Sequence, residues 1–145
     1  MLNEANTLLD LRLNYLEIVK KTLLHSFWDE EEPRVSPIIA KLKTVAPRLF
    51  GRYRGSAEEK LAGQAWPKFA YTMIGIKRLE NIQYCVEQVI KDKVEGDLIE
   101  TGVWRGGACI FMRALLKSYG IKDRTVWLAD SFQGLPPPKC GEISC

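Results

Sequence analysis

The sequence has few of the side chains that metal and thiol chemistry require. Its 145 residues include one histidine, His25, and four cysteines, none of which forms a C-x-x-C pair. These groups are too few and too scattered to predict a zinc site, and we expect free thiols in a cytoplasmic protein. Cys85 and Cys109 fall inside helical patterns, which predicts that both are buried as small apolar side chains.

The sequence also lacks long apolar runs and a strong excess of one charge. No run approaches the roughly 20 apolar residues of a membrane span, and acidic residues interrupt the N-terminus where a signal peptide would have its apolar core. The 21 basic and 18 acidic side chains give a net charge of +3, without a basic stripe. We therefore expect neither a membrane nor a nucleic-acid partner.

The first 70 residues predict an N-terminal helix followed by a lid-like segment. Residues 4–27 carry a broad apolar helical face, with acidic side chains early and basic ones late, as the helix dipole favours. From Pro33 to about Trp66, prolines and glycines divide the chain into short apolar pieces, and loops this long often act as lids. We assign residues 1–70 to this unit and residues 71–145 to a second one.

The second unit predicts an α/β fold. A helix from about Met73 to Lys93 precedes the strand "DLIET" (97–101), a helix from about Arg105 to Ser118, and the strand "TVWLAD" (125–130). A strand, a crossover helix and another strand predict a right-handed parallel βαβ unit.

The turn after the first strand combines glycines with two carboxylates. Gly102 follows the strand, and Gly106 and Gly107 open the helix, where the backbone can approach a ligand and unpaired N–H groups face it. Glu100 and Asp130 end the two strands. The G-x-x-x-G-G spacing and a carboxylate that would repel a pyrophosphate disfavour a nicotinamide dinucleotide. An acid at Asp130 suits ribose hydroxyls, so a ligand such as S-adenosylmethionine fits this arrangement.

Three segments then point to a family. "YTMIGIKRLENIQ", "GDLIETGVWRGGACIFMRALL" and "DRTVWLADSFQGLPPP", within residues 70–138, resemble the macrocin O-methyltransferase family. The resemblance implies a class I methyltransferase (Rossmann-like) fold with an N-terminal helical extension. It implies S-adenosyl-L-methionine as methyl donor, Mg²⁺ in full-length members, and a sugar hydroxyl of a glycosylated natural product as acceptor. It leaves homo-oligomer formation open.

The resemblance also implies cofactor-binding residues in three groups. The methionine end of the cofactor would be lined by Glu100, Thr101, Gly102, Val103 and Trp104, with Gly106 at the helix start. The ribose and adenine side would meet Asp130 and Ser131. Thr72 and Met73 would close over the cofactor from the preceding helix.

The sequence departs from the family pattern at its end. It stops at Cys145, soon after the second strand, so we expect the catalytic residues beyond residue 145 and no metal ligand within this chain. Three hypotheses follow. The first is a sugar O-methyltransferase in an incomplete chain, with a fold truncated after the second strand. The second is an inactive or partner-binding truncated product, and a less favoured third is a nucleotide-dependent oxidoreductase.

Overall fold

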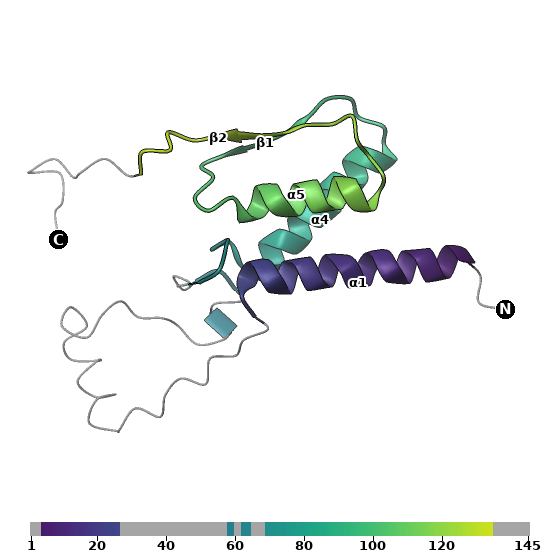
Figure 1. The fold of residues 1–145 in the computed structure, drawn as a ribbon, viewed down its shortest axis with the longest axis horizontal. Helices are drawn as coiled ribbons and strands as arrows, with labels where there is room; N and C mark the ends of the chain where they lie inside the picture. Colours follow the sequence, from purple (N-terminus) through teal and green to yellow (C-terminus); the bar gives the residue numbers. More distant parts are fainter. Residues whose placement is uncertain (1–3, 27–57, 60–61, 65–68, 135–145) are drawn as a thin grey trace, which may run out of the picture.

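A computed structural model describes the predicted N-terminal helix and most of the second predicted unit. The described residues are 4–26, 58–59, 62–64 and 69–134 (Figure 1). Most of the predicted lid-like stretch from Pro33 to Trp66 lies outside these described residues.

The described part is α/β, as predicted. Its main elements are α1 (Glu4–Leu24), α4 (Gly75–Lys91), β1 (Leu98–Thr101), α5 (Gly107–Ser118) and β2 (Val126–Ala129). Each predicted helix and strand is present, and each is one to three residues shorter at one or both ends than predicted.

The two strands pair in parallel, which confirms the predicted pairing. Leu98 lies opposite Val126 at one end of the sheet, and Thr101 lies opposite Ala129 at the other. Within the described residues these strands form a two-stranded sheet. Because the strands are parallel and end together, the residues that follow Thr101 and Ala129 are brought to the same edge.

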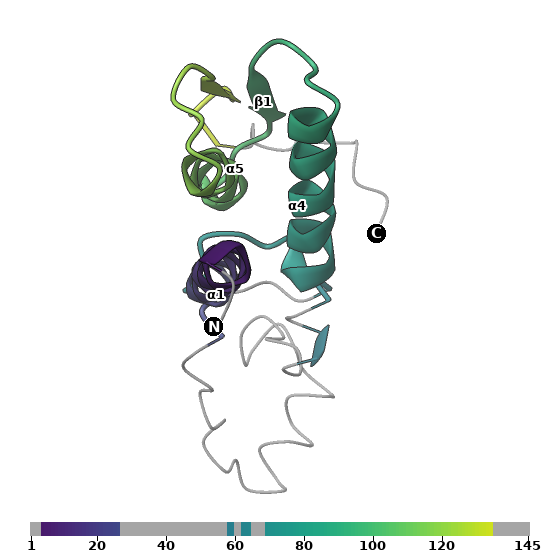
Figure 2. The ribbon, with the colours of Figure 1, turned by 90° about the vertical axis from the view of Figure 1, so that its right-hand side faces the viewer.

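Helix α5 is the centre of this structure. It contacts β1 and β2 and also packs against α1 and α4; Figure 1 shows it between the sheet and α1, and Figure 2 shows α4 beside it. Eight of its twelve residues are buried: Gly107, Ala108, Cys109, Phe111, Met112, Ala114, Leu115 and Leu116. Ile110, Arg113 and Lys117, spaced by three and four residues, make an exposed stripe.

The core lies between α5 and the two long helices. Leu16 from α1, Val86 from α4, and Phe111 and Leu115 from α5 are buried in one cluster, as the apolar patterns predicted. Ile82, predicted with them, is only partly buried at the edge of the cluster.

The prediction that Cys85 is buried is wrong. Its side chain is exposed, whereas Cys109 is buried as predicted. The buried positions on α4 include Leu79 and Val86. Successive helical residues are rotated by about 100°, so Cys85 lies to one side of the stripe that contains Val86 and faces solvent.

Contacts at the C-terminal end of α5 tie it to both other helices. The Arg12 guanidinium of α1 lies 4.1 Å from the centre of the Tyr119 ring, and its Nε donates to the Ser118 carbonyl at 3.1 Å. The Tyr119 hydroxyl donates to Glu87 of α4 at 3.0 Å. These contacts fix the C-terminal end of α5 relative to α1 and α4.

Asp97 joins the two strands where they begin. Its Oδ1 accepts a hydrogen bond from the Thr125 N–H at 2.9 Å, and its Oδ2 accepts one from the Trp127 indole at 2.8 Å. These two bonds, the backbone one first, hold the pKa of the Asp97 carboxyl below its usual value. An aspartate therefore fastens the end of the sheet opposite the glycines.

Candidate cofactor-binding site

The glycine turn, residues 102–106, connects β1 to α5. Three of its residues have positive φ angles: Gly102 at 83°, Trp104 at 48° and Gly106 at 78°. This conformation costs residues with a Cβ about 1–2 kcal/mol, and glycine avoids the cost. A Cβ added at Gly102 or Gly106 would meet nothing within 4 Å. The glycines therefore set the path of the backbone and leave open space beside it.

Asp130 fixes this turn from the end of β2. Its Oδ2 accepts a hydrogen bond from the Val103 N–H at 2.7 Å, and its Oδ1 accepts one from the Phe132 N–H at 3.1 Å. The backbone bonds from Phe132 and then Val103 hold the pKa of the Asp130 carboxyl below its usual value. The Gly102 N–H also donates to the Ala129 carbonyl at 3.0 Å. The sequence predicted that Asp130 lies at this edge of the sheet, but it did not predict that Asp130 shapes the turn.

The two apolar side chains of the turn, Val103 and Trp104, lie in different environments. Val103 is 5% exposed and belongs to the apolar core, so only its backbone faces the turn. Trp104 is partly exposed and lies against the Arg105 guanidinium, 4.5 Å from the ring centre. Arg105 also donates from Nη1 to the Ala70 carbonyl at 3.0 Å, which ties the segment before α4 to the turn.

Thr72 packs against the first residue of α5. The Gly107 N–H donates to the Tyr71 carbonyl at 3.0 Å, and Thr72 is buried there. The predicted position of Thr72 and Met73 on the preceding helix is wrong, since α4 begins at Gly75 and both residues lie in the turn ahead of it. The structure thus brings Thr72 to the helix start that carries the glycines.

Glu100 is turned toward α5. It lies on the same face of β1 as Leu98, and its Oε2 accepts a hydrogen bond from the Cys109 thiol at an S···O distance of 2.8 Å. Burial, followed by the hydrogen bond and the negative charge of Glu100, raises the pKa of the Cys109 thiol to about 12. The thiol therefore stays protonated near neutral pH and keeps its donor.

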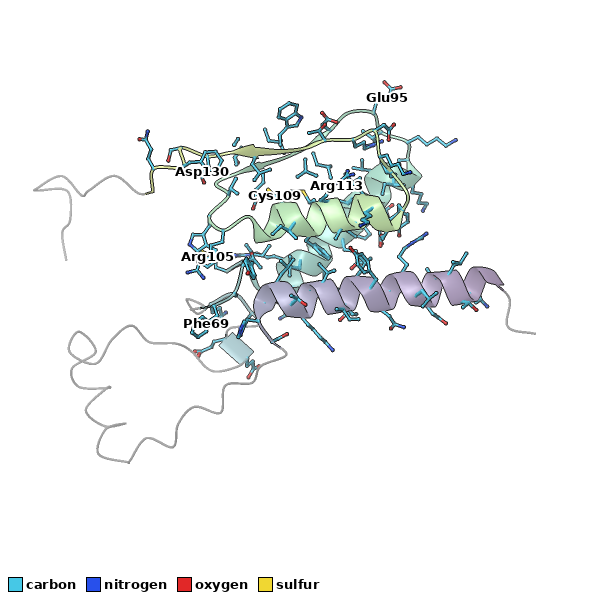
Figure 3. All side chains as sticks on the ribbon, viewed as in Figure 1. Phe69, Glu95, Arg105, Cys109, Arg113 and Asp130 are labelled. Atoms are coloured by element: carbon cyan, nitrogen blue, oxygen red, sulfur yellow. The ribbon has the colours of Figure 1, made fainter. Side chains whose placement is uncertain are left out.

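These residues gather at one end of the βαβ unit. Figure 3 shows Asp130, Cys109 and Arg105 toward this end, and Glu95 at the opposite one. Thr101 and Ser131, the remaining predicted cofactor-binding residues, are exposed at the two strand ends. Sequence reasoning missed Arg105 and Cys109. No spacing in the sequence pairs Cys109 with Glu100, because their contact depends on how α5 packs on β1.

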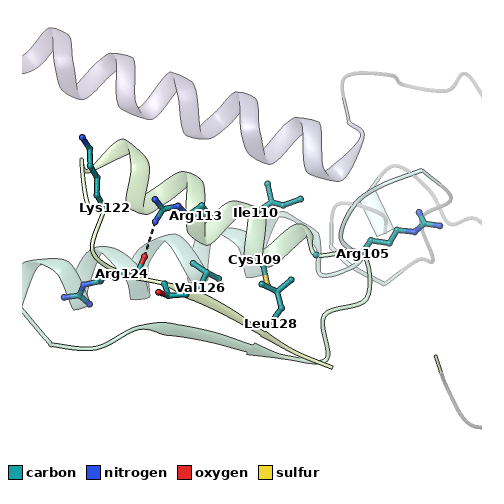
Figure 4. A pocket seen from close by; sticks show the side chains of 10 residues that line it. Arg105, Cys109, Ile110, Arg113, Lys122, Arg124, Val126 and Leu128 are labelled. Carbon is teal, nitrogen blue, oxygen red and sulfur yellow. Dashed lines mark hydrogen bonds between the residues drawn. The ribbon is translucent and has the colours of Figure 1, made fainter. Parts of the chain in front are cut away.

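A separate, broad cavity of about 630 Å³ opens between α5 and the edge of β2 (Figure 4). Its apolar wall includes Ile110 of α5 and Val126 and Leu128 of β2, and basic side chains including Arg113 and Lys122 surround it. At one end the cavity is also lined by Arg105 and Gly106 of the glycine turn and by Cys109 of α5. The cavity therefore flanks the sheet, whereas the turn lies at the end of the sheet.

No metal site emerges from the residues that the structure describes. They contain no group of three or more histidine, cysteine, aspartate or glutamate side chains placed to hold an ion. We assign none of the described side chains to Mg²⁺.

The described residues form no helix both long enough and apolar enough to cross a membrane.

Comparison with known proteins identifies the family. The model of the macrocin-O-methyltransferase (TylF) family matches residues 12–144. The chain belongs to this family. The match spans the helical region and the βαβ unit, and confirms the family expected from the segments within residues 70–138.

Three curated O-methyltransferases resemble parts of this chain that cover between 54% and 88% of its length. It is 46% identical over 122 residues to a mycinamicin III 3''-O-methyltransferase of Micromonospora griseorubida, covering 84% of this chain and 43% of that protein. It is 46% identical over 127 residues to a tetracenomycin-C rhamnosyl 4'-O-methyltransferase of Streptomyces olivaceus, covering 88% and 44%. A demethyldecarbamoylnovobiocin O-methyltransferase of Streptomyces niveus is 65% identical over 79 residues, covering 54% and 30%.

A solved structure shows the same arrangement. The O-methyltransferase NovP aligns with a TM-score of 0.67 and 44% identity, over 92% of this chain and 47% of its own. The chain thus spans less than half the length of the family members that it matches.

Proposed function

We propose that this chain forms part of an enzyme that transfers a methyl group from S-adenosyl-L-methionine to a sugar hydroxyl of a natural product. The family supports methyl transfer, and the name of one relative places O-methylation on a rhamnosyl tetracenomycin. The observation that carries the proposal is the glycine turn, whose open side lies beside the ends of β1 and β2. The likeness to NovP supports a class I methyltransferase (Rossmann-like) fold, with residues 71–145 as the start of the cofactor-binding domain.

We assign the cofactor to the open space beside Gly102 and Gly106. There the backbone can approach the ligand closely, and the N-terminus of α5 contributes a partial positive charge. The N–H groups of Gly106 and Gly107 already donate to the Val103 and Tyr71 carbonyls. Glu100 would meet the cationic methionine end. Asp130 accepts hydrogen bonds from the N–H groups of Val103 and Phe132 and, at 3.4 Å, from the Ser131 hydroxyl. An ionised carboxylate has about four acceptor positions, so about one remains for a ribose hydroxyl. The other proposed contacts are Thr72, Met73, Thr101, Val103, Trp104 and Ser131.

The described residues would bind and orient the cofactor. When bound, S-adenosyl-L-methionine supplies an electrophilic methyl group. Holding this group in line with the acceptor oxygen lowers the entropic part of the barrier, and the acceptor hydroxyl must also lose a proton to a base. We assign neither that base nor a Mg²⁺ ligand to the described residues, and their expected place beyond residue 145 stays a prediction.

The test is a calorimetric titration with S-adenosylhomocysteine, using a family-length protein that carries this chain. Wild-type protein should bind the compound, and Asp130→Ala should weaken binding by about 1–3 kcal/mol because partner groups are left unpaired. Asp97→Ala is the matched control, since Asp97 also accepts a backbone N–H bond, from Thr125, and one from the Trp127 indole, but lies at the opposite end. It should leave the affinity within about twofold, because it removes no group near the ligand.

Two outcomes would count against the proposal. Wild-type protein that binds NADH and not S-adenosylhomocysteine would favour the oxidoreductase. Equal losses of affinity in Asp97→Ala and Asp130→Ala would show that Asp130 acts only by stabilising the sheet.

A further inference from the structure

A buried thiol reaches Glu100 from the side of α5. Cys109 is the third residue of α5, is 4% exposed, and lies 2.8 Å from Oε2 of Glu100. The thiol donates and the carboxylate accepts, which leaves Oε1 of Glu100 outside this contact. The pair joins the strand that ends at the glycine turn to the helix that begins there.

The environment of Glu100 explains why a donor is needed at position 109. Glu100 is itself partly buried and shares its face of β1 with Leu98, which packs against the apolar core. A carboxylate turned toward apolar side chains is costly unless a hydrogen bond compensates it. The raised pKa of Cys109 keeps that donor on the sulfur throughout the neutral range.

We propose that Cys109 is a positioning residue for cofactor binding, because its thiol holds Oε2 of Glu100 and presents Oε1 to the bound cofactor. The inference rests on the proposed function, in which Glu100 meets the methionine end of S-adenosyl-L-methionine. Without the thiol, Glu100 must satisfy both oxygens elsewhere or adopt other rotamers. Binding the cofactor would then include the cost of ordering this side chain.

The test compares Cys109→Ala, which removes the donor, with Cys109→Ser, which keeps one. In a family-length protein, Cys109→Ala should weaken S-adenosylhomocysteine binding about tenfold, as expected for losing a hydrogen bond to a charged group. Cys109→Ser should stay within about threefold of wild type, because its hydroxyl can replace the thiol. In a protein that already carries Glu100→Gln, adding Cys109→Ala should weaken S-adenosylhomocysteine binding much less than tenfold. The reason is that the side chain at position 100, which Cys109 positions, has lost its charge.

A spectroscopic signature separates positioning from packing. The infrared S–H stretching band that disappears in Cys109→Ala reports this thiol. The band should shift in Glu100→Gln, and it should shift again when S-adenosylhomocysteine is added to wild-type protein. A residue that only fills space would lower the melting temperature when mutated but would show neither shift.

The outcomes distinguish this inference from the function on which it rests. Wild-type protein that binds no S-adenosylhomocysteine contradicts the proposed function and this inference together. Wild-type protein that binds it, with Cys109→Ala at unchanged affinity or with an S–H band indifferent to Glu100→Gln, overturns the role of Cys109 alone.

Discussion

Gly107→Ala should destabilise the protein by about 3 kcal/mol, at the upper end of the cost of overpacking a core. A Cβ at this position would lie 2.4 Å from the Tyr71 carbonyl oxygen and 2.7 Å from Cβ of Thr72. The carbonyl is backbone and cannot rotate away, so the segment before α4 must move. That movement would also break the hydrogen bond from the Gly107 N–H to Tyr71.

Gly106→Asn is the matched control for this prediction. It adds a larger side chain one residue away, at a φ of 78° with nothing within 4 Å of the new Cβ. Asparagine adopts left-handed angles more readily than other residues, so this variant should cost less than about 1 kcal/mol. Chemical denaturation of both variants measures the difference. A Gly107→Ala protein as stable as wild type would show that Tyr71 and Thr72 do not pack on α5.

Gly102→Val should weaken S-adenosylhomocysteine binding by at least about tenfold, while the protein remains folded. The φ of 83° strains any β-branched residue, and the side chain would enter the open space that we assign to the cofactor. The valine side chain would exclude the ligand in addition to straining the backbone. The affinity should therefore fall more than the loss of stability alone explains. Calorimetry measures the affinity, and thermal denaturation measures the strain.

Gly120→Val separates these two effects. Gly120 has a φ of 72° and open space around its missing Cβ, so the backbone strain is similar. It follows the far end of α5, about 18 Å along the helix from the glycine turn. Gly120→Val should therefore destabilise the protein like Gly102→Val and leave cofactor affinity unchanged. If both variants lose affinity equally, the loss at Gly102 reflects stability, and the glycine is structural.

The sequence was sufficient to predict the elements and the parallel pairing of the two strands. Parallel strands separated by one helix end at the same edge, so the residues that follow Thr101 and Ala129 could be placed at one edge from the strand pattern alone. The family resemblance covered the same segments, and the family match confirmed it.

The contacts that shape the site could not be predicted in the same way. The Asp130 bond to the Val103 N–H and the Glu100 bond to Cys109 depend on which way each side chain turns, and spacing does not determine that. The packing of Thr72 on Gly107 joins segments 35 residues apart through a missing Cβ. The exposure of Cys85 was predictable in principle, because the buried positions of α4 already defined its apolar face.

A backbone amide NMR titration with S-adenosylhomocysteine tests the central claim most directly. The amides of Gly102, Trp104 and Gly106 should shift on binding, together with those around Asp130. Amides near Gly120 and Thr125, at the other end of the βαβ unit, should stay unchanged. Shifts confined to residues of the cavity between α5 and β2, such as Arg113 and Thr125, would contradict the assignment of the cofactor to the glycine turn.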